Sequence, residues 1–236
     1  MKFEALHRRF LVAREDYSEK VGPQEIWSVA DHWPLFAGTY ELARHLAIVD
    51  LVRSTVGLPG DLVEFGTWRG ATAMLLAKVV KIEDPWSPKV VHAFDSFEGL
   101  EEFHDHDRDA VDFRGWHRGS RDELREMIRL HQLGEELVVH EGLIEQTLPD
   151  YLDQRPEWSL SFVYCDTDLY SSTRTVLEHV PGRIVPGGVL AFDEWSAERF
   201  PGEGIAINER FEQLRETFDV ELRRATPQPT LVLRKR

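Results

Sequence analysis

Cysteine is nearly absent from the sequence: Cys165 is the single cysteine in 236 residues. One cysteine excludes an internal disulfide and a zinc cluster built on cysteine ligands, which is typical of a reducing compartment. Apolar runs of the roughly 20 residues that cross a bilayer are also missing, and the opening MKFEALHRRFLVARED is charged rather than signal-like. We therefore expect a cytoplasmic protein without membrane contacts, in which Cys165 lies buried in a strand.

Basic residues are the minority among the charges. The chain carries 28 Lys and Arg against 42 Asp and Glu, which gives a formal net charge of -14. Such a charge repels phosphate backbones and anionic lipid surfaces, so it argues against nucleic-acid partners. The length fits one large domain with a sizeable core, and leaves room for a small helical extension but not for a second full domain.

Two helical stretches precede the first predicted strand, at residues 3–18 and roughly 39–56. From Asp61 onward, apolar strands alternate with helices, a pattern typical of a parallel sheet covered by helices on both faces. The last two strands, FDVELRRA and PTLVLRKR, follow each other through a short link and predict a terminal hairpin. We expect a helical N-terminal extension at 1–57 and an α/β domain at 58–236.

The longest stretch without clear periodicity is SFEGLEEFHDHDRDAVDFRGWHR, residues 96–118. Loops of this length in compact domains are usually lids or disordered segments. Its interleaved aromatic residues favour a lid that packs over something. His104 and His106 lie in its HDHD run, where they are candidates for a catalytic role as well as for a plain solvated loop.

Acidic residues stand at the end of every predicted parallel strand. Because ligands of open parallel sheets lie outside the carboxyl ends of the strands, these acids are candidates for a shared site. Each of them alone has a structural explanation, as a solvated strand end or a helix cap, but that explanation is weaker for all of them together. The strand ends are Glu64 with Gly66, Asp95, Glu141 with Gly142, Asp166 with Asp168, and Asp193 with Glu194.

The first strand runs into the turn EFGTWRG, residues 64–70. A dinucleotide fingerprint has the spacing G-x-G-x-x-G, which admits a pyrophosphate at the helix N-terminus. Here the spacing is G-x-x-x-G and Glu64 stands where phosphate would approach, so NAD and FAD are disfavoured. Asp95, after the next strand, is placed to accept the hydroxyls of a ribose. Together they predict a nucleoside with a positively charged, amino-acid-like tail, whereas the turn alone is equally typical of a strand-to-helix connection.

Two acidic pairs follow later strands: Asp166 with Asp168, and Asp193 with Glu194. The ends of neighbouring strands lie about 4.8 Å apart, so these carboxylates can converge and then need a cation. Oxygen ligands select a hard ion, Mg²⁺ or Ca²⁺, which would lower the pKa of a substrate hydroxyl. We predict a metal site at Asp166, Asp193 and Glu194. The alternative is that Asp168 caps the helix starting near Tyr170 and that Asp193 and Glu194 are simply exposed.

Five segments carry a recognisable pattern: VEFGTWRGATA, FDSFEGL, EGLIEQTLPDYL, CDTDLYSSTRTVLEHVPGRIVPGGVLAFDEW and FPGEGIA. With them, the sequence resembles the macrocin O-methyltransferase family of S-adenosylmethionine-dependent enzymes over roughly residues 38–210. Members of this family methylate sugar hydroxyls in antibiotic biosynthesis. The resemblance implies a Rossmann-like class I methyltransferase fold, with a mostly parallel seven-stranded sheet, an antiparallel C-terminal strand, and often a divalent ion such as Mg²⁺.

The resemblance also implies roles for individual residues. Asp166 matches a metal ligand and candidate general base, and Asp193 with Glu194 matches the paired acids, where many relatives have Asp-Asp. We predict cofactor contacts for Tyr40, Glu64, Gly66, Thr67, Trp68, Gly70, Asp95, Ser96, Gly142 and Asp166. We predict acceptor contacts for Asp168, Tyr170, Trp195, Phe200 and Glu203.

We expect methyl transfer from S-adenosylmethionine to a hydroxyl of a sugar or glycosylated small molecule, in natural-product or polysaccharide biosynthesis. The step is an in-line displacement, so positioning and deprotonation of the acceptor oxygen supply most of the acceleration. Asp166, His104 or His106 is the predicted base. Two alternatives stay open: an NAD(P)-dependent oxidoreductase and a non-catalytic ligand-binding protein of the same fold. The apolar residues of the first helix predict a homo-oligomer.

Overall fold

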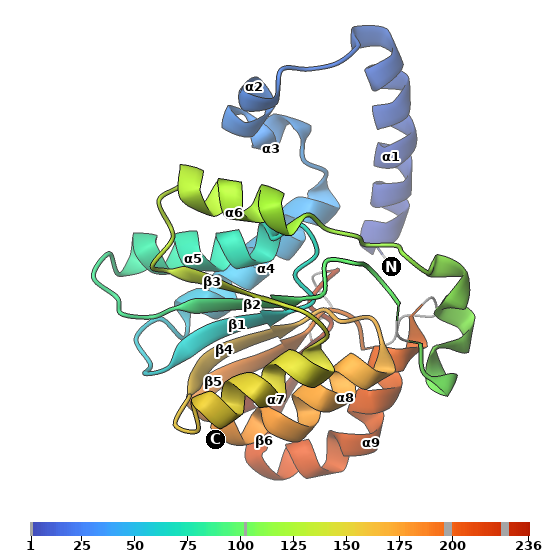
Figure 1. The fold of residues 1–236 in the computed structure, drawn as a ribbon. Coiled ribbons are helices and arrows are strands. Elements are labelled where there is room, and N and C mark those ends of the chain that lie inside the picture. Colours follow the sequence, from blue (N-terminus) through green and yellow to red (C-terminus); the bar gives the residue numbers. More distant parts are fainter. Residues whose placement is uncertain (1, 102, 196–199, 223–226) are drawn as a thin grey trace.

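A seven-stranded mixed sheet forms the centre of the protein in the computed structural model, which describes residues 2–101, 103–195, 200–222 and 227–236 (Figure 1). The strands are β1 (Asp61–Phe65), β2 (Val91–Asp95), β3 (Leu137–Glu141), β4 (Leu160–Cys165), β5 (Ile184–Phe192), β6 (Phe218–Leu222) and β7 (Leu231–Lys235). Their order is β3-β2-β1-β4-β5-β7-β6. β1 to β5 run parallel, whereas β7 is antiparallel to β5 and to β6. The predicted fold class is confirmed.

Helices cover both faces of this sheet (Figure 1). They are α1 (Lys2–Val21), α2 (Ile26–Asp31), α3 (Trp33–Phe36), α4 (Thr39–Arg53), α5 (Ala71–Glu83), α6 (Arg121–Leu130), α7 (Ile144–Gln154), α8 (Tyr170–His179) and α9 (Pro201–Thr217), with the 3-10 helices η1 (Asp105–Phe113) and η2 (Pro181–Arg183). α4, α5 and α6 pack on one face, and α7, α8 and α9 pack on the other. None of the helices that the structure describes has both the length and the apolar character needed to cross a bilayer.

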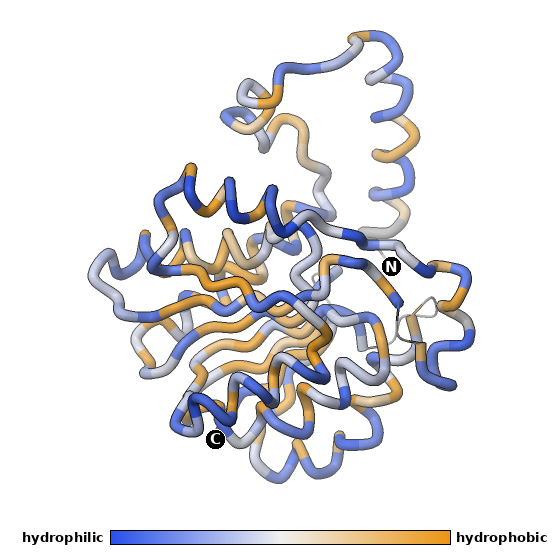
Figure 2. Tube along the Cα trace, viewed as in Figure 1, coloured by the Kyte–Doolittle hydropathy of each residue, from blue (hydrophilic) through white to orange (hydrophobic). Residues whose placement is uncertain are grey.

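The central strands are apolar on both sides because helices cover both sides. Every residue of β4 is buried, and so are the last four residues of β1. Figure 2 shows these strands as predominantly hydrophobic. The side chains of Phe65, Phe94, Phe162 and Tyr164 are fully inaccessible, and burial of one such side chain contributes about 1.5–3 kcal/mol. Cys165, at the end of β4, is buried as predicted.

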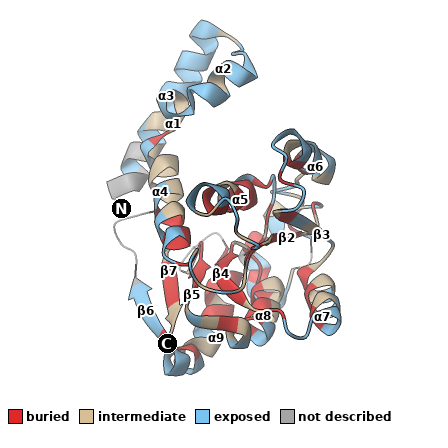
Figure 3. Ribbon diagram, turned by 90° about the vertical axis from the view of Figure 1, so that its left-hand side faces the viewer, coloured by how far each residue is buried: buried red, intermediate tan, exposed pale blue. Residues whose placement is uncertain are grey.

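The helices that precede the sheet divide into two parts. α4 packs against α5, and its side chains Ile48 and Leu51 belong to the core on that face of the sheet. α1, α2 and α3 project from this body, and most of their side chains are exposed (Figure 3), including Trp27 and Leu35. The predicted extension at 1–57 thus includes one helix, α4, that packs as part of the core.

The last two strands form the predicted hairpin at the edge of the sheet. β6 and β7 pair in antiparallel fashion, from Phe218 opposite Lys235 to Leu222 opposite Leu231. β7 inserts next to β5, so β6 is the edge strand. The predicted strand over 218–225 extends beyond Leu222 into 223–226, which lies outside the described residues.

The predicted lid at 96–118 contains a 3-10 helix, η1, that the sequence pattern did not reveal; residue 102 lies outside the described part. η1 forms because His104 and Asp107 cap each other: the Asp107 carboxylate accepts the His104 backbone N–H at 2.8 Å, and the His104 ring accepts the His106 N–H at 3.2 Å. The aromatic residues of the lid pack, as predicted, with Phe103 and Phe113 against a small apolar cluster.

Candidate active site

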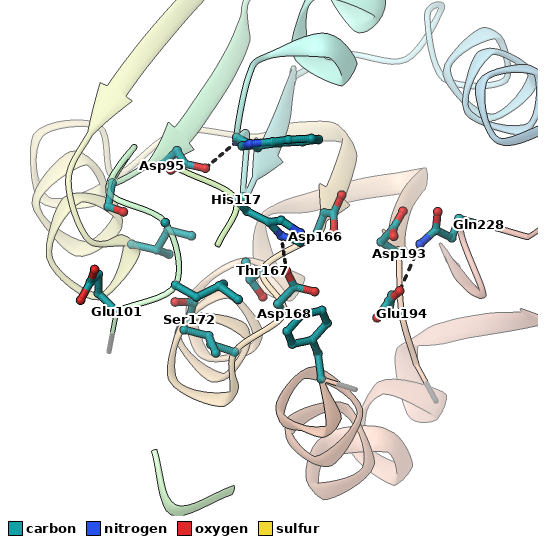
Figure 4. A pocket seen from close by; sticks show the side chains of 18 of the residues that line it. Asp95, Glu101, His117, Asp166, Thr167, Asp168, Ser172, Asp193, Glu194 and Gln228 are labelled. Carbon is teal, nitrogen blue, oxygen red and sulfur yellow. Dashed lines mark hydrogen bonds and ion pairs between the residues drawn. The ribbon is translucent and has the colours of Figure 1, made fainter. Parts of the chain in front are cut away.

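A cavity of about 310 Å³ opens at the carboxyl ends of β1, β2, β4 and β5 (Figure 4). Residues from the strand ends, from α4, from the lid and from the loop before β7 line it. Its volume lies within the range of small-molecule sites. Nine of the predicted site residues line this cavity: Gly66, Trp68, Asp95, Ser96, Asp166, Asp168, Asp193, Glu194 and Phe200.

Gly66 makes the floor of the cavity possible. It has a left-handed φ of 83°, and a Cβ atom there would lie 1.8 Å from the carbonyl oxygen of Asp166. Only glycine lets the end of β1 approach the end of β4 this closely. The glycine at this position therefore lets two strand ends that border the cavity pack together, and the predicted contact of Gly66 with a cofactor stays a prediction.

Asp95 holds two loops that border the cavity. One carboxylate oxygen accepts the backbone N–H of Trp68 and the other accepts that of Phe97, both at 2.6 Å. Burial raises the pKa of Asp95, and these hydrogen bonds oppose the shift. Each oxygen keeps a lone pair, so Asp95 can still accept from a ribose in the cavity, next to Ser96.

Glu64 does not line the cavity. It is buried beneath it, where its carboxylate accepts the backbone N–H of Ala73 at 3.0 Å and so fixes the start of α5. Burial raises the pKa of Glu64 to about 8. Four further residues predicted to contact a cofactor also lie outside the lining: Tyr40, Thr67, Gly70 and Gly142.

Asp166 and Asp193 converge on one point, as the strand ends predict, but the cation between them is an arginine. The Arg44 Nη2 atom lies 2.9 Å from Asp166 Oδ2 and 3.1 Å from Asp193 Oδ1, and Arg44 Nε donates to the latter at 3.2 Å. Asp193 Oδ1 also accepts the hydroxyl of Tyr164. Burial, followed by the charge of Asp193, raises the pKa of Asp166, and Arg44 opposes the shift.

The magnesium site predicted at Asp166, Asp193 and Glu194 is not formed. Across the described residues, no group of three His, Cys, Asp or Glu side chains is arranged to hold a metal ion. Glu194 Oε1 accepts instead from the Gln228 amide at 3.3 Å (Figure 4). The donor set therefore fits a divalent ion poorly, because the Arg44 guanidinium lies against one oxygen of each aspartate and would repel a second cation.

Glu194 leaves one acceptor open to the cavity that it lines. Its Oε2 atom is buried and has no hydrogen-bond partner among the described residues. Burial, with the charges of Asp168 and Asp193, raises the pKa of Glu194 to about 7. A buried oxygen without a partner is costly, so this atom is available to accept from a ligand hydroxyl or ammonium group.

His117, in the lid, lines the cavity and contacts Asp168. The His117 Nδ1 atom lies 3.1 Å from Asp168 Oδ2 (Figure 4). This hydrogen bond raises the pKa of His117, burial opposes the shift, and the charges of Asp168, Glu194 and Asp95 add to it. When Nδ1–H donates to Asp168, the other ring nitrogen, Nε2, is left as a proton acceptor.

Asp168 does not cap α8, which was the structural alternative for it. Asp107 of the lid performs that role: its Oδ1 atom accepts the Tyr170 backbone N–H at 3.0 Å. Close packing at this point depends on Gly202, where a Cβ atom would lie 1.9 Å from Asp107 Oδ1. The lid is thereby attached to the starts of α8 and α9.

His104 and His106, the predicted histidine bases, do not reach the cavity. Both are exposed, and both rings pack on Tyr170 with centroids 4.6 Å apart. Tyr170, predicted to contact the acceptor, points its hydroxyl at Glu209, at 2.8 Å. These three predictions are not supported by the positions of the side chains.

Glu203, predicted to contact the acceptor, is fully buried below the site. Its carboxylate accepts the backbone N–H groups of Thr167 at 3.2 Å, Asp168 at 3.3 Å and Glu194 at 3.2 Å. Burial, followed by nearby carboxylates, raises its pKa well above the usual value. Glu203 thus orients the two loops that carry the acids, and it does not face a ligand.

Trp195 also lies away from the cavity. Its indole N–H donates to Asn208 at 3.0 Å, and its ring stacks on Phe211. Phe200 does line the cavity, as predicted.

Backbone strain concentrates around the cavity. Five non-glycine residues in the described ranges have positive φ, and three of them, Trp68, His117 and Asp168, line it. A fourth, Phe97, follows the lining residue Ser96. Each left-handed non-glycine residue costs about 1–3 kcal/mol and persists where surrounding contacts enforce it, most often at functional sites.

Among the lining residues that the sequence prediction missed are a cation and a candidate base, Arg44 and His117. Both enter from outside the strand ends, Arg44 from α4 and His117 from the lid. One signal was available for His117, since it lies beside Trp116 in the segment predicted to be a lid. Arg44 lies within a helix and carried no such signal.

The fold and site define a class I methyltransferase. The solved structure of the calicheamicin methyltransferase CalS11 superimposes with a TM-score of 0.82 at 26% identity, covering 94% of this chain and 90% of that one. The O-methyltransferase NovP gives a TM-score of 0.68 at 25% identity, covering 82% and 79%. Residues 8–217 match the Macrocin-O-methyltransferase (TylF) family. The chain belongs to this family.

Curated relatives of the chain are named as O-methyltransferases of natural products, and the name of the first includes a rhamnosyl group. One is the 8-demethyl-8-(2,3-dimethoxy-alpha-L-rhamnosyl)-tetracenomycin-C 4'-O-methyltransferase of Streptomyces olivaceus, 32% identical over 70% of this chain and 66% of the relative. Another is the demethyldecarbamoylnovobiocin O-methyltransferase of Streptomyces niveus, 28% identical over 77% and 72%. The chain thus spans about two thirds of the length of the first of these relatives.

Membership of this class implies S-adenosylmethionine as the methyl donor, and the described residues fit that cofactor. Gly66 lines the cavity, and its lack of a Cβ atom lets the end of β1 pack against the Asp166 backbone. Asp95 and Ser96 line the cavity with oxygen atoms suited to the hydroxyls of a ribose, and Glu194 Oε2 is a buried acceptor without a partner among the described residues. The cavity therefore offers a cradle and anionic acceptors to a nucleoside with a cationic tail.

Proposed function

We propose that the protein transfers a methyl group from S-adenosylmethionine to a hydroxyl of a sugar or glycosylated small molecule, in natural-product or polysaccharide biosynthesis. One observation carries the proposal: residues suited to the cofactor and a histidine-carboxylate pair line the same cavity. The names of the curated relatives support a sugar-containing acceptor.

The proton of the acceptor hydroxyl has to leave as the carbon–oxygen bond forms. His117 is our proposed general base, since Asp168 holds the tautomer in which Nε2 accepts a proton. Glu203 accepts two backbone N–H groups from the loop of Asp168. These hydrogen bonds hold Asp168 in position to contact His117. The bound cofactor supplies an electrophilic methyl group on a sulfonium. The residues of the chain then need only position and deprotonate the acceptor oxygen.

Catalysis is tested with radiolabelled S-adenosylmethionine and a panel of acceptors. We expect label transfer to sugar nucleotides or glycosides that carry a free hydroxyl, and no transfer to the matching deoxy or methylated compounds. Transfer to protein, nucleic acid or an aglycone alone, with none to the sugar panel, would contradict the proposed acceptor class.

Cofactor identity is tested by thermal unfolding. S-adenosylhomocysteine at 100 times its Kd should stabilise the native state by about 2.7 kcal/mol, because it binds only the folded protein. That corresponds to a rise in Tm of roughly 5–11 °C for a chain of this length. NADH at the same concentration should leave the Tm unchanged. A shift with NADH and none with S-adenosylhomocysteine would favour the oxidoreductase alternative.

The homo-oligomer expected from the sequence stays a prediction. Apolar side chains on the projecting helices support it, among them Trp27 and Leu35. Single exposed apolar residues are normal, but a group of them on helices that project from the body is typical of an interaction surface.

A further inference from the structure

Arg44 is a cation that lines the site, and neither the strand-end pattern nor the cofactor requires it. It comes from α4, which precedes the first strand in the sequence, and its side chain is only 17% exposed. Its guanidinium lies 5.7 Å from the centre of the Tyr164 ring. Asp193, Tyr164 and Asp166 raise the pKa of Arg44 and outweigh the effect of burial, so the group is a permanent cation.

Two carboxylates that meet in a buried site repel each other unless a positive charge joins them. Arg44 makes three such contacts, one to Asp166 and two to Asp193. Asp193 is nearly inaccessible, with 4% of its side chain exposed. The charge that this pair needs is therefore supplied within the chain, through directed hydrogen bonds.

A divalent ion bound at this pair would lie against Arg44. Asp166 Oδ2 and Asp193 Oδ1 already accept from the guanidinium, so an ion on either carboxylate would meet a like charge at close range. Glu194, the third predicted ligand, accepts from Gln228 at 3.3 Å through Oε1, and its Oε2 atom has no partner among the described residues. The position of Arg44 therefore opposes an ion at this site.

We propose that Arg44 supplies the positive charge of the Asp166–Asp193 pair in place of a divalent ion, so that α4 completes the active site. Arg44 is a positioning residue: its guanidinium holds both carboxylates at the ends of β4 and β5. This inference concerns the site of the proposed function. Only the activity measurement below depends on that function being correct.

The test is Mn²⁺ binding, measured by the loss of the free-ion electron paramagnetic resonance signal, which needs no turnover. The intact protein should bind Mn²⁺ with a Kd weaker than about 1 mM. Arg44→Ala leaves two uncompensated carboxylates and should bind at least about tenfold more tightly. Arg44→Lys keeps the charge and should bind Mn²⁺ no better than the intact protein.

Arg53→Ala is the matched control, because Arg53 lies on the same helix and pairs with Glu83 at 2.6 Å, with 55% of its side chain exposed. It should leave Mn²⁺ binding unchanged. Methyl transfer by the intact protein should proceed at an unchanged rate in excess EDTA. Tight Mn²⁺ binding by the intact protein, or activity that EDTA abolishes and Mn²⁺ restores, would overturn the inference. If no acceptor is methylated at all, the proposed function fails while the binding data still decide the role of Arg44.

Discussion

Replacement of Gly66 by alanine should abolish cofactor binding and lower the free energy of unfolding by at least about 3 kcal/mol. The new Cβ atom would lie 1.8 Å from the Asp166 carbonyl oxygen and 2.6 Å from its carbonyl carbon. Both are backbone atoms of a buried strand end, so no side-chain rotation relieves the contact. The left-handed φ of 83° adds about 1–2 kcal/mol for any residue with a Cβ atom.

The measurement is thermal unfolding with and without S-adenosylhomocysteine. We expect the Tm to fall by roughly 6–12 °C and the ligand-induced shift to disappear. Gly182→Ala is the control, since a Cβ atom at Gly182 has no neighbour within 4 Å; its Tm should stay the same or rise slightly. A Gly66→Ala protein with the Tm and ligand response of the unaltered chain would show that β1 and β4 tolerate greater separation here than the structure indicates.

Most of the fold could be predicted from the sequence because the central strands are buried on both faces. β4 is apolar apart from Ser161, and such a run is typical of a central parallel strand. The limits appear where tertiary contacts decide. η1 depends on reciprocal capping by His104 and Asp107, which involves no apolar periodicity. α4 belongs to the core through Ile48 and Leu51, although its place before the first strand suggested an extension.

The site was predictable to the extent that topology alone places residues. The ends of parallel strands meet at one edge, so Asp95, Asp166 and Asp193 fall together whatever the loops do. Topology does not predict which group each acidic side chain contacts. Glu64 caps a helix and Glu203 holds two loops from below, yet in the sequence both look like ligands for a cofactor or acceptor.

The sequence did not predict the role of Arg44 for the same reason. Converging carboxylates indicate that a positive charge is needed, but not whether a metal or a side chain provides it. Arg44 is more than 120 residues from Asp166 in the chain, and only the packing of α4 brings the two together. The need for a positive charge beside these carboxylates can thus be predicted from the sequence. Which group supplies that charge depends on the tertiary structure.

Loss of the His117–Asp168 pair should have the largest effect on the chemical step. His117→Ala removes the proposed base and should lower kcat by about 100-fold or more, while the Kd for S-adenosylhomocysteine stays within a few fold. Asp168→Asn should also lower kcat, because an amide can stabilise the wrong tautomer of the ring. The assay is methyl transfer to the acceptor found in the panel, with ligand binding measured separately.

The pH profile distinguishes a base from a merely structural histidine. Only neutral His117 accepts a proton, so kcat/KM should rise with pH through the pKa of His117, which Asp168 holds above its usual value of 6.5. Asp168→Asn removes the largest cause of that shift and should move the midpoint to lower pH. Glu194 and Asp95 still raise the pKa while burial lowers it, so the midpoint should settle closer to 6.5. His104→Ala should keep both the rate and the midpoint, because its ring packs on Tyr170 outside the cavity. If the midpoint does not move in Asp168→Asn, or if His117→Ala keeps the original profile, the base is another group.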